Sequence, residues 1–157
     1  MTKYSLYALT LLFLGFLGLA NAVYLVQAYS GNAELNCSVI SGCAVVAESP
    51  YSVLFGMSLP SLGVVFFLAL FVGAAVLLIL RSYKVAALYM GLAILGFIFS
   101  LYFIYLQFFV IGAVCVYCLI SAVVSTLMAG FSVGVYQEAR SYLQPKVIPI
   151  VPPMFRP

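Results

Sequence analysis

The longest uncharged stretch of the chain runs from Val85 to Gln137. A helix needs roughly 20 apolar residues to cross a bilayer, so this stretch is too long for one crossing and must fold back on itself. We place the turn at Gly112–Cys115. Backbone that is not helical would leave polar groups unsatisfied in lipid, so both halves are expected to be helices. The stretch therefore predicts two spans, at about 85–111 and 115–136.

Two further apolar segments precede this stretch. One covers about residues 4–29 and the other about 58–80, where Pro60 falls in the first turn and its missing N–H costs nothing. We therefore predict an all-α integral membrane protein, a bundle of four transmembrane helices in a single domain over residues 1–137.

The charge content excludes several classes of protein. The 157 residues include six Lys or Arg, three Glu, and no His or Asp. A soluble domain carries about a quarter charged residues, so a soluble enzyme is excluded. Six scattered basic residues form no patch for nucleic acid. Without His, and with few carboxylates, most zinc, iron and acid–base sites cannot be built.

The distribution of the basic residues predicts the orientation. With four crossings, the N-terminus, the 81–84 turn and the C-terminal tail share one side of the membrane. All the basic residues lie there: Lys3, Arg81, Lys84, Arg140, Lys146 and Arg156. This bias places both termini in the cytoplasm. All four cysteines fall on the opposite, extracytoplasmic side, where a disulfide persists.

Two segments lie outside the spans. The loop over 30–57 is too apolar for a hydrated linker, and we expect it to lie across the extracytoplasmic end as a cap. The cytoplasmic tail over 138–157 holds five of the seven prolines and no helical period, so it is expected to be extended or disordered.

Cys115 and Cys118 form a C-x-x-C motif at the start of the fourth span. The N-terminus of a helix favours thiolate over thiol, and the thiolate is the species that attacks a disulfide. A structural disulfide, or two thiols packed as small apolar groups, remains an alternative.

Cys37 and Cys43 lie in the loop between the first two spans. By themselves they are compatible with a local structural disulfide. A zinc site shared by both pairs is disfavoured, because such sites use two closely spaced pairs on rigid turns. Together the pairs suggest a relay. The outer pair would exchange with a protein, and the inner pair would reach a lipid-soluble quinone.

The order of these motifs resembles the vitamin K epoxide reductase family and its prokaryotic homologues. The loop pair precedes a C-x-x-C at the start of the fourth span, and Ser49 follows Cys43 by six residues. The segments Ser100-Leu-Tyr102 and Phe108-Phe-Val110 also resemble the vertebrate enzyme. The resemblance covers roughly residues 4–136. The cysteine order differs from that of the bacterial disulfide-bond formation protein B.

The resemblance implies a role for each cysteine. Cys37 would exchange disulfides with a thioredoxin-like partner, and Cys43 would attack a disulfide at Cys115. Cys118 would deliver electrons to a quinone of the menaquinone, ubiquinone or vitamin K type, with no metal. Ser49 would organise the loop or the pocket by hydrogen bonding. We expect the quinone pocket to include Leu62, Phe66, Phe67, Ile111 and Ala122.

Two positions depart from the vertebrate pattern. Ala122 stands where the vertebrate enzyme has a pocket tyrosine, and Ser52 stands where it has a pocket asparagine. The expected function is therefore reoxidation of a separate thioredoxin-like protein with reduction of a quinone, in support of disulfide-bond formation. The alternatives are a vitamin K quinone or epoxide reductase proper, and a non-catalytic four-helix scaffold with structural disulfides.

Overall fold

The computed structural model describes residues 2–29, 45–46, 49–54 and 56–143. Four helices in it are long and apolar enough to cross a membrane. They are α1 (Lys3–Tyr29), α3 (Leu59–Leu80), α4 (Tyr83–Tyr105), which continues into the π-helix η2 (Leu106–Ile111), and α5 (Val116–Leu143). The predicted all-α membrane bundle with four spans is confirmed.

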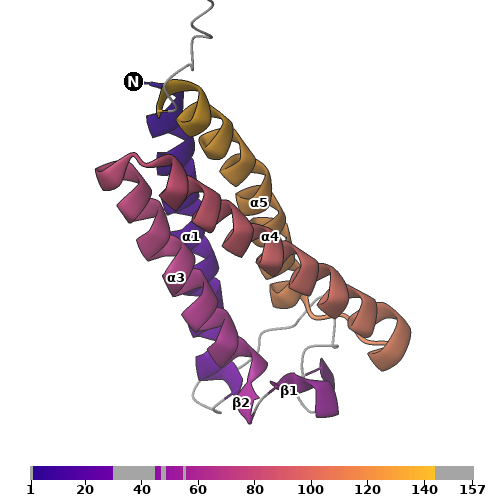
Figure 1. The fold of residues 1–157 in the computed structure, drawn as a ribbon. Helices are drawn as coiled ribbons and strands as arrows, with labels where there is room; N and C mark the ends of the chain where they lie inside the picture. Colours follow the sequence, from indigo (N-terminus) through magenta and orange to yellow (C-terminus); the bar gives the residue numbers. More distant parts are fainter. Residues whose placement is uncertain (1, 30–44, 47–48, 55, 144–157) are drawn as a thin grey trace, which may run out of the picture.

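The helices are closely packed at one end of the bundle and spread apart toward the other. α1 packs along both α3 and α5, and α4 packs along α5. α3 and α4 meet at their short connection and then diverge toward the opposite end (Figure 1). Small and aliphatic residues fill the core, among them Ala8, Leu11, Leu70, Ala74 and Met128. Large apolar side chains such as Phe13 and Leu88 are exposed on the outside, where lipid would cover them.

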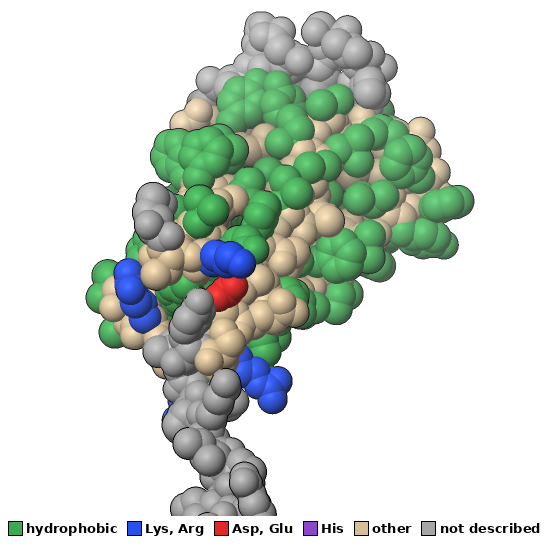
Figure 2. Space-filling view, turned by 90° about the horizontal axis from the view of Figure 1, so that it is seen from above, with side chains coloured by type: hydrophobic (Ala, Val, Ile, Leu, Met, Phe, Trp, Pro, Cys, Tyr) green, Lys and Arg blue, Asp and Glu red, His purple; other side chains and the backbone are tan. Residues whose placement is uncertain are grey.

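The end that carries the N-terminus is held by contacts between α1 and α3. The Tyr4 hydroxyl donates a hydrogen bond to the Leu77 carbonyl at 2.8 Å. Arg81, whose φ is 43°, caps the C-terminus of α3, and its backbone N–H donates to the same carbonyl. Lys3, Lys84 and Arg140 belong to helix ends on this side as well. Basic side chains gather here, while apolar side chains cover the flanks (Figure 2).

A short β-hairpin, which no sequence pattern predicted, lies at the opposite end of the bundle. The 3-10 turn η1 (Pro50–Ser52) leads into β1 (Val53–Leu54), which pairs antiparallel with β2 (Met57–Ser58). Gly56, with φ of 78°, makes the turn, a conformation that glycine adopts without strain. α3 follows directly, with Pro60 in its first turn as expected.

α5 is longer than the expected span of 115–136. It continues to Leu143, so the beginning of the expected tail at 138 lies inside the helix. Two physical reasons account for this difference. Val135 and Ala139 are buried in the core, and the first proline of the tail, which would break a helix, is Pro145. The rest of the expected tail, 144–157, lies outside the described residues.

Candidate active site

The C-x-x-C motif lies where η2 turns back into α5. Gly112 adopts a left-handed conformation with φ of 68°, and Cys115 precedes the first residue of α5, with its carbonyl accepting the Leu119 N–H at 3.1 Å. Both cysteines are free thiols, Cys115 fully buried and Cys118 half-buried. Cys115 therefore occupies the N-terminal cap of α5, as the sequence predicted.

The surroundings of Cys115 favour its thiolate. The Cys118 thiol donates a hydrogen bond to the Cys115 sulfur, and the backbone N–H groups of Cys118 and Tyr117 add to this effect. Burial opposes it. The hydrogen bonds outweigh the effect of burial, and the pKa of Cys115 is lowered to about 7 from the ordinary thiol value of 9.0. A thiol with this pKa is substantially ionised at neutral pH, which suits it to disulfide exchange.

The described part of the cap, residues 45–46, 49–54 and 56–57, includes a side chain that covers Cys115. Val46 is buried and packs with Cys115, against Ile111 and Tyr117. The Ser49 hydroxyl donates to the Val46 carbonyl at 2.8 Å, and the Ser49 N–H reaches the same oxygen at 3.3 Å. Ser49 thus fixes the turn that holds Val46 in place above the cysteine.

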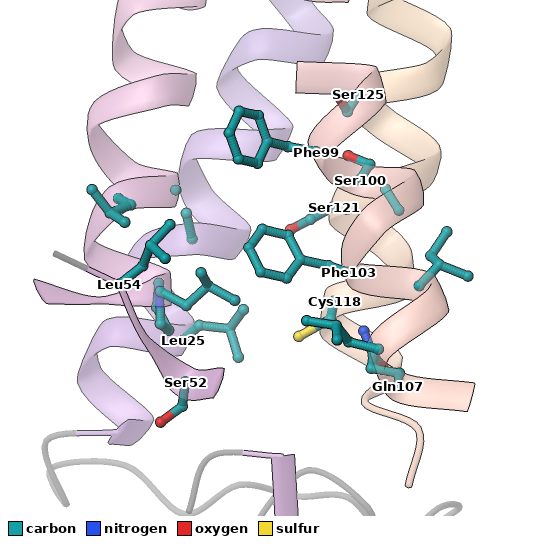
Figure 3. A pocket seen from close by; sticks show the side chains of 18 of the residues that line it. Leu25, Ser52, Leu54, Phe99, Ser100, Phe103, Gln107, Cys118, Ser121 and Ser125 are labelled. Carbon is teal, nitrogen blue, oxygen red and sulfur yellow. The ribbon is translucent and has the colours of Figure 1, made fainter. Parts of the chain in front are cut away.

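A cavity of about 370 Å³ lies between the diverging helices and the cap. Its lining is almost entirely apolar and comes from all four helices, η2 and the cap. Cys118 lines it, whereas Cys115 does not (Figure 3). All five residues expected in the quinone pocket line this cavity: Leu62, Phe66, Phe67, Ile111 and Ala122. Its volume falls within the range of about 300–1,000 Å³ that is usual for small-molecule sites.

Two glycines position the aromatic wall of the cavity. A Cβ at Gly18 of α1 would overlap the ring of Phe67, and a Cβ at Gly96 of α4 would overlap the ring of Phe66. The two rings, which meet edge to face with centroids 5.4 Å apart, therefore rest directly on the neighbouring backbones. Small residues at membrane helix contacts allow such close approach.

Few polar side chains face this cavity. Gln107 of η2 is buried, and its Oε1 accepts the Cys115 N–H at 2.8 Å. Ser121 accepts from Asn21 Nδ2 at 2.8 Å, and this nitrogen also donates to the Tyr117 carbonyl at 3.0 Å. The hydroxyl of Ser125 is buried without a partner among the described residues. Ser52, also buried, lines the cavity from the cap.

Neither Gln107 nor Ser125 was identified from the sequence. A signal for Gln107 was present. Gly96, Ser100 and Phe103 precede it at helical spacing on the side of α4 that lines the cavity. A strongly polar residue on the inner side of a membrane helix is a candidate functional residue.

The loop cysteines, Cys37 and Cys43, lie outside the described residues, so the predicted proximity of the two pairs stays a prediction. Within the described ranges, no three His, Cys, Asp or Glu side chains are grouped so as to hold a metal ion.

Two comparisons with known proteins bear on this site. The sequence model of the vitamin K epoxide reductase family matches residues 9–133, which include α3, α4 and η2 complete, most of α1 and α5, and both cysteine pairs. A search of curated proteins found no match.

Proposed function

The chain belongs to the vitamin K epoxide reductase family, a family of helical membrane oxidoreductases, and from this premise we propose that it oxidises a thioredoxin-like protein and passes the electrons to a quinone. The observation that carries the proposal is the position of the C-x-x-C pair. Cys118 lines an apolar cavity within the bundle, while Cys115 lies directly under the cap. One pair thus contacts both an apolar cavity and the loop whose sequence contains Cys37 and Cys43.

The overall reaction balances as a two-electron exchange. The partner dithiol loses two electrons and two protons and becomes a disulfide. The quinone gains two electrons and two protons and leaves as hydroquinone. Cys37 and Cys43 take the electrons from the partner by disulfide exchange. Cys43 then attacks the disulfide between Cys115 and Cys118. Attack on the Cys115 sulfur forms a Cys43–Cys115 disulfide and releases Cys118 as a thiolate beside the cavity. Cys37 then attacks Cys43 and releases Cys115, and the low pKa of Cys115 supports this second step, since a more acidic thiol leaves faster.

The cavity is chemically suited to a quinone substrate. Its apolar lining matches a flat ring system with a lipid tail, and Phe66 and Phe67 offer aromatic surfaces to that ring. The unpaired hydroxyl of Ser125 is a buried donor without an acceptor in the described part of the chain, and a carbonyl oxygen of the substrate would supply one. Cys118 is the cysteine of the pair with access to this space.

We further propose that the cysteine end faces the extracytoplasmic side and that both termini are cytoplasmic. The support is the gathering of the described basic residues at the opposite end of the bundle (Figure 2). The thioredoxin-like partner would then act on the extracytoplasmic side.

A redox titration tests the proposal against a scaffold that is held by structural disulfides. We expect the Cys115–Cys118 couple to titrate at a potential above about −300 mV, because a catalytic disulfide must be readily reduced. The purified protein would be equilibrated with thiol buffers, and mass spectrometry after alkylation would give the fraction reduced. A couple that stays oxidised below that potential would identify a structural disulfide and contradict the proposed function.

A further inference from the structure

We propose that Gln107 binds the quinone directly, by donating a hydrogen bond from its amide nitrogen to a carbonyl oxygen of the ring. This inference rests on the proposed function and assigns a residue to the recognition of the substrate.

The orientation of the Gln107 amide is fixed by the backbone of the C-x-x-C motif. Its Oε1 accepts the Cys115 N–H at 2.8 Å, and only the oxygen of the amide can accept from that donor. The nitrogen therefore occupies the other end of the amide. It faces the cavity on the side where Cys118 lies (Figure 3), and it has no hydrogen-bond acceptor among the described residues.

Two serines of the cavity also present donors, whereas the hydroxyls of Ser49 and Ser100 already donate to the backbone carbonyls of Val46 and Gly96. Ser121 already accepts the Asn21 amide N–H through its oxygen, which leaves its hydroxyl hydrogen for another acceptor. The Ser125 hydroxyl, 2% exposed, has no partner within the ranges that the structure describes. Gln107, Ser121 and Ser125 thus offer three donors, and a cavity with such donors is complementary to a ligand that carries acceptors, such as a quinone carbonyl.

A donor at this position would also assist the reaction. A carbonyl oxygen of the ring gains negative charge as electrons arrive from the cysteine pair, and a preoriented N–H stabilises that charge in an apolar site. Gln107 is held in place for this task by the same hydrogen bond that fixes Cys115. One amide thus connects the backbone of the exchanging cysteine with the substrate.

The test compares two ligands on two variants. The ligands are menadione and methylnaphthalene, which has the same ring skeleton without oxygens. The variants are Gln107→Met, which removes the amide at nearly constant volume, and Gln137→Met, the same change at an exposed position near the other end of α5. Dissociation constants would be measured on the fully oxidised full-length protein, so that no turnover occurs.

We expect Gln107→Met to weaken menadione binding by about five- to tenfold, the usual effect of one lost hydrogen bond, and to leave methylnaphthalene binding unchanged. Gln137→Met should change neither. Equal loss for both ligands in Gln107→Met would show a purely structural role and overturn the inference, as would no loss for either. If the wild-type protein binds no quinone, the proposed function itself fails.

A measurement that leaves Gln107 in place covers the case in which Gln107→Met does not fold. The carbonyl stretching frequency of bound menadione should lie below its value in alkane solution, because a hydrogen bond weakens the C=O bond. This shift should persist in Ser125→Ala, since Gln107 remains as the donor. An unshifted band, or a shift that disappears in Ser125→Ala, would overturn the assignment to Gln107.

Discussion

Cys115 and Cys118 lie within one turn at the start of α5 but have different surroundings. Cys115 is sealed under Val46 and receives hydrogen bonds that favour its thiolate, whereas Cys118 faces an apolar cavity. The C-x-x-C spacing at a helix start was sufficient to predict the backbone N–H groups beside Cys115, because a helix N-terminus always presents free N–H groups. The cover by Val46 and the hydrogen bond from the Cys118 thiol were not predicted. The amide of Gln107 was not predictable, because its contact with Cys115 depends on how η2 turns back into α5.

Cys118 is expected to control the pKa of Cys115. The hydrogen bond from the Cys118 thiol is the largest cause of the lowered value, so Cys118→Ala should raise the pKa above about 7 and reduce the thiolate fraction at neutral pH. A pH titration of the far-ultraviolet thiolate absorbance would measure this, in protein whose Cys37 and Cys43 are replaced by serine.

Cys118→Ser serves as the matched control, because its hydroxyl can still donate to the Cys115 sulfur. It should keep the titration midpoint lower than Cys118→Ala does. Identical midpoints in Cys118→Ala and in protein that retains Cys118 would show that the backbone N–H groups alone set the pKa.

At the scale of elements, the helices followed from hydropathy, whereas the hairpin of β1 and β2 did not. The uncharged stretch 85–137 had to turn once, and Gly112 marks the turn in the structure as it did in the sequence. The hairpin of β1 and β2 was missed because each strand is only two residues long and no alternating pattern can be recognised over that length. The end of α5 was placed too early, because the burial of Val135 and Ala139 depends on contacts with distant parts of the chain.

Gly91 and Gly112 should respond in opposite directions to substitution by alanine. Gly112 has φ of 68° and Gly91 lies inside α4, and at neither position does an added Cβ meet another described atom within 4 Å. Gly112→Ala should therefore destabilise the protein by about 1 kcal/mol through backbone strain alone, whereas Gly91→Ala should stabilise it by about 0.5–1 kcal/mol. Denaturant unfolding in detergent would give both free energies.

A change of the same sign for both glycines would contradict this expectation. In particular, a neutral or stabilising Gly112→Ala would mean that the turn between η2 and α5 does not need the left-handed conformation. The turn would then contribute less to the position of Cys115 than the geometry indicates.

At the scale of the whole molecule, the two ends of the bundle differ in chemistry. One end carries the described basic residues (Figure 2), and the other carries the hairpin of β1 and β2 (Figure 1), the C-x-x-C pair and the residues of the cap that line the cavity. This separation could be predicted from the order of charges and spans. The cavity itself could only be anticipated as a set of residues, because its volume arises from the divergence of α3 and α4, which no local pattern encodes.

Thiol labelling tests the orientation that this asymmetry indicates. In intact cells, a membrane-impermeant maleimide should label Cys37 and Cys43 after mild reduction, because the positive-inside bias places the cysteine end outside. A cysteine introduced by Lys84→Cys, at the opposite end, should react only after lysis. The reverse pattern would mean that the bundle is inserted with its cysteines toward the cytoplasm.

The most direct measurement of the central claim is electron transfer through the purified protein. With a reduced thioredoxin-like protein as donor and a lipid-soluble quinone as acceptor, we expect one quinone to be reduced for every two partner thiols lost, as a two-electron couple requires. Replacement of Cys118 by alanine should abolish quinone reduction, because Cys118 is the cysteine that lines the cavity. Quinone reduction that persists in Cys118→Ala, at the rate of the unsubstituted protein, would contradict the account.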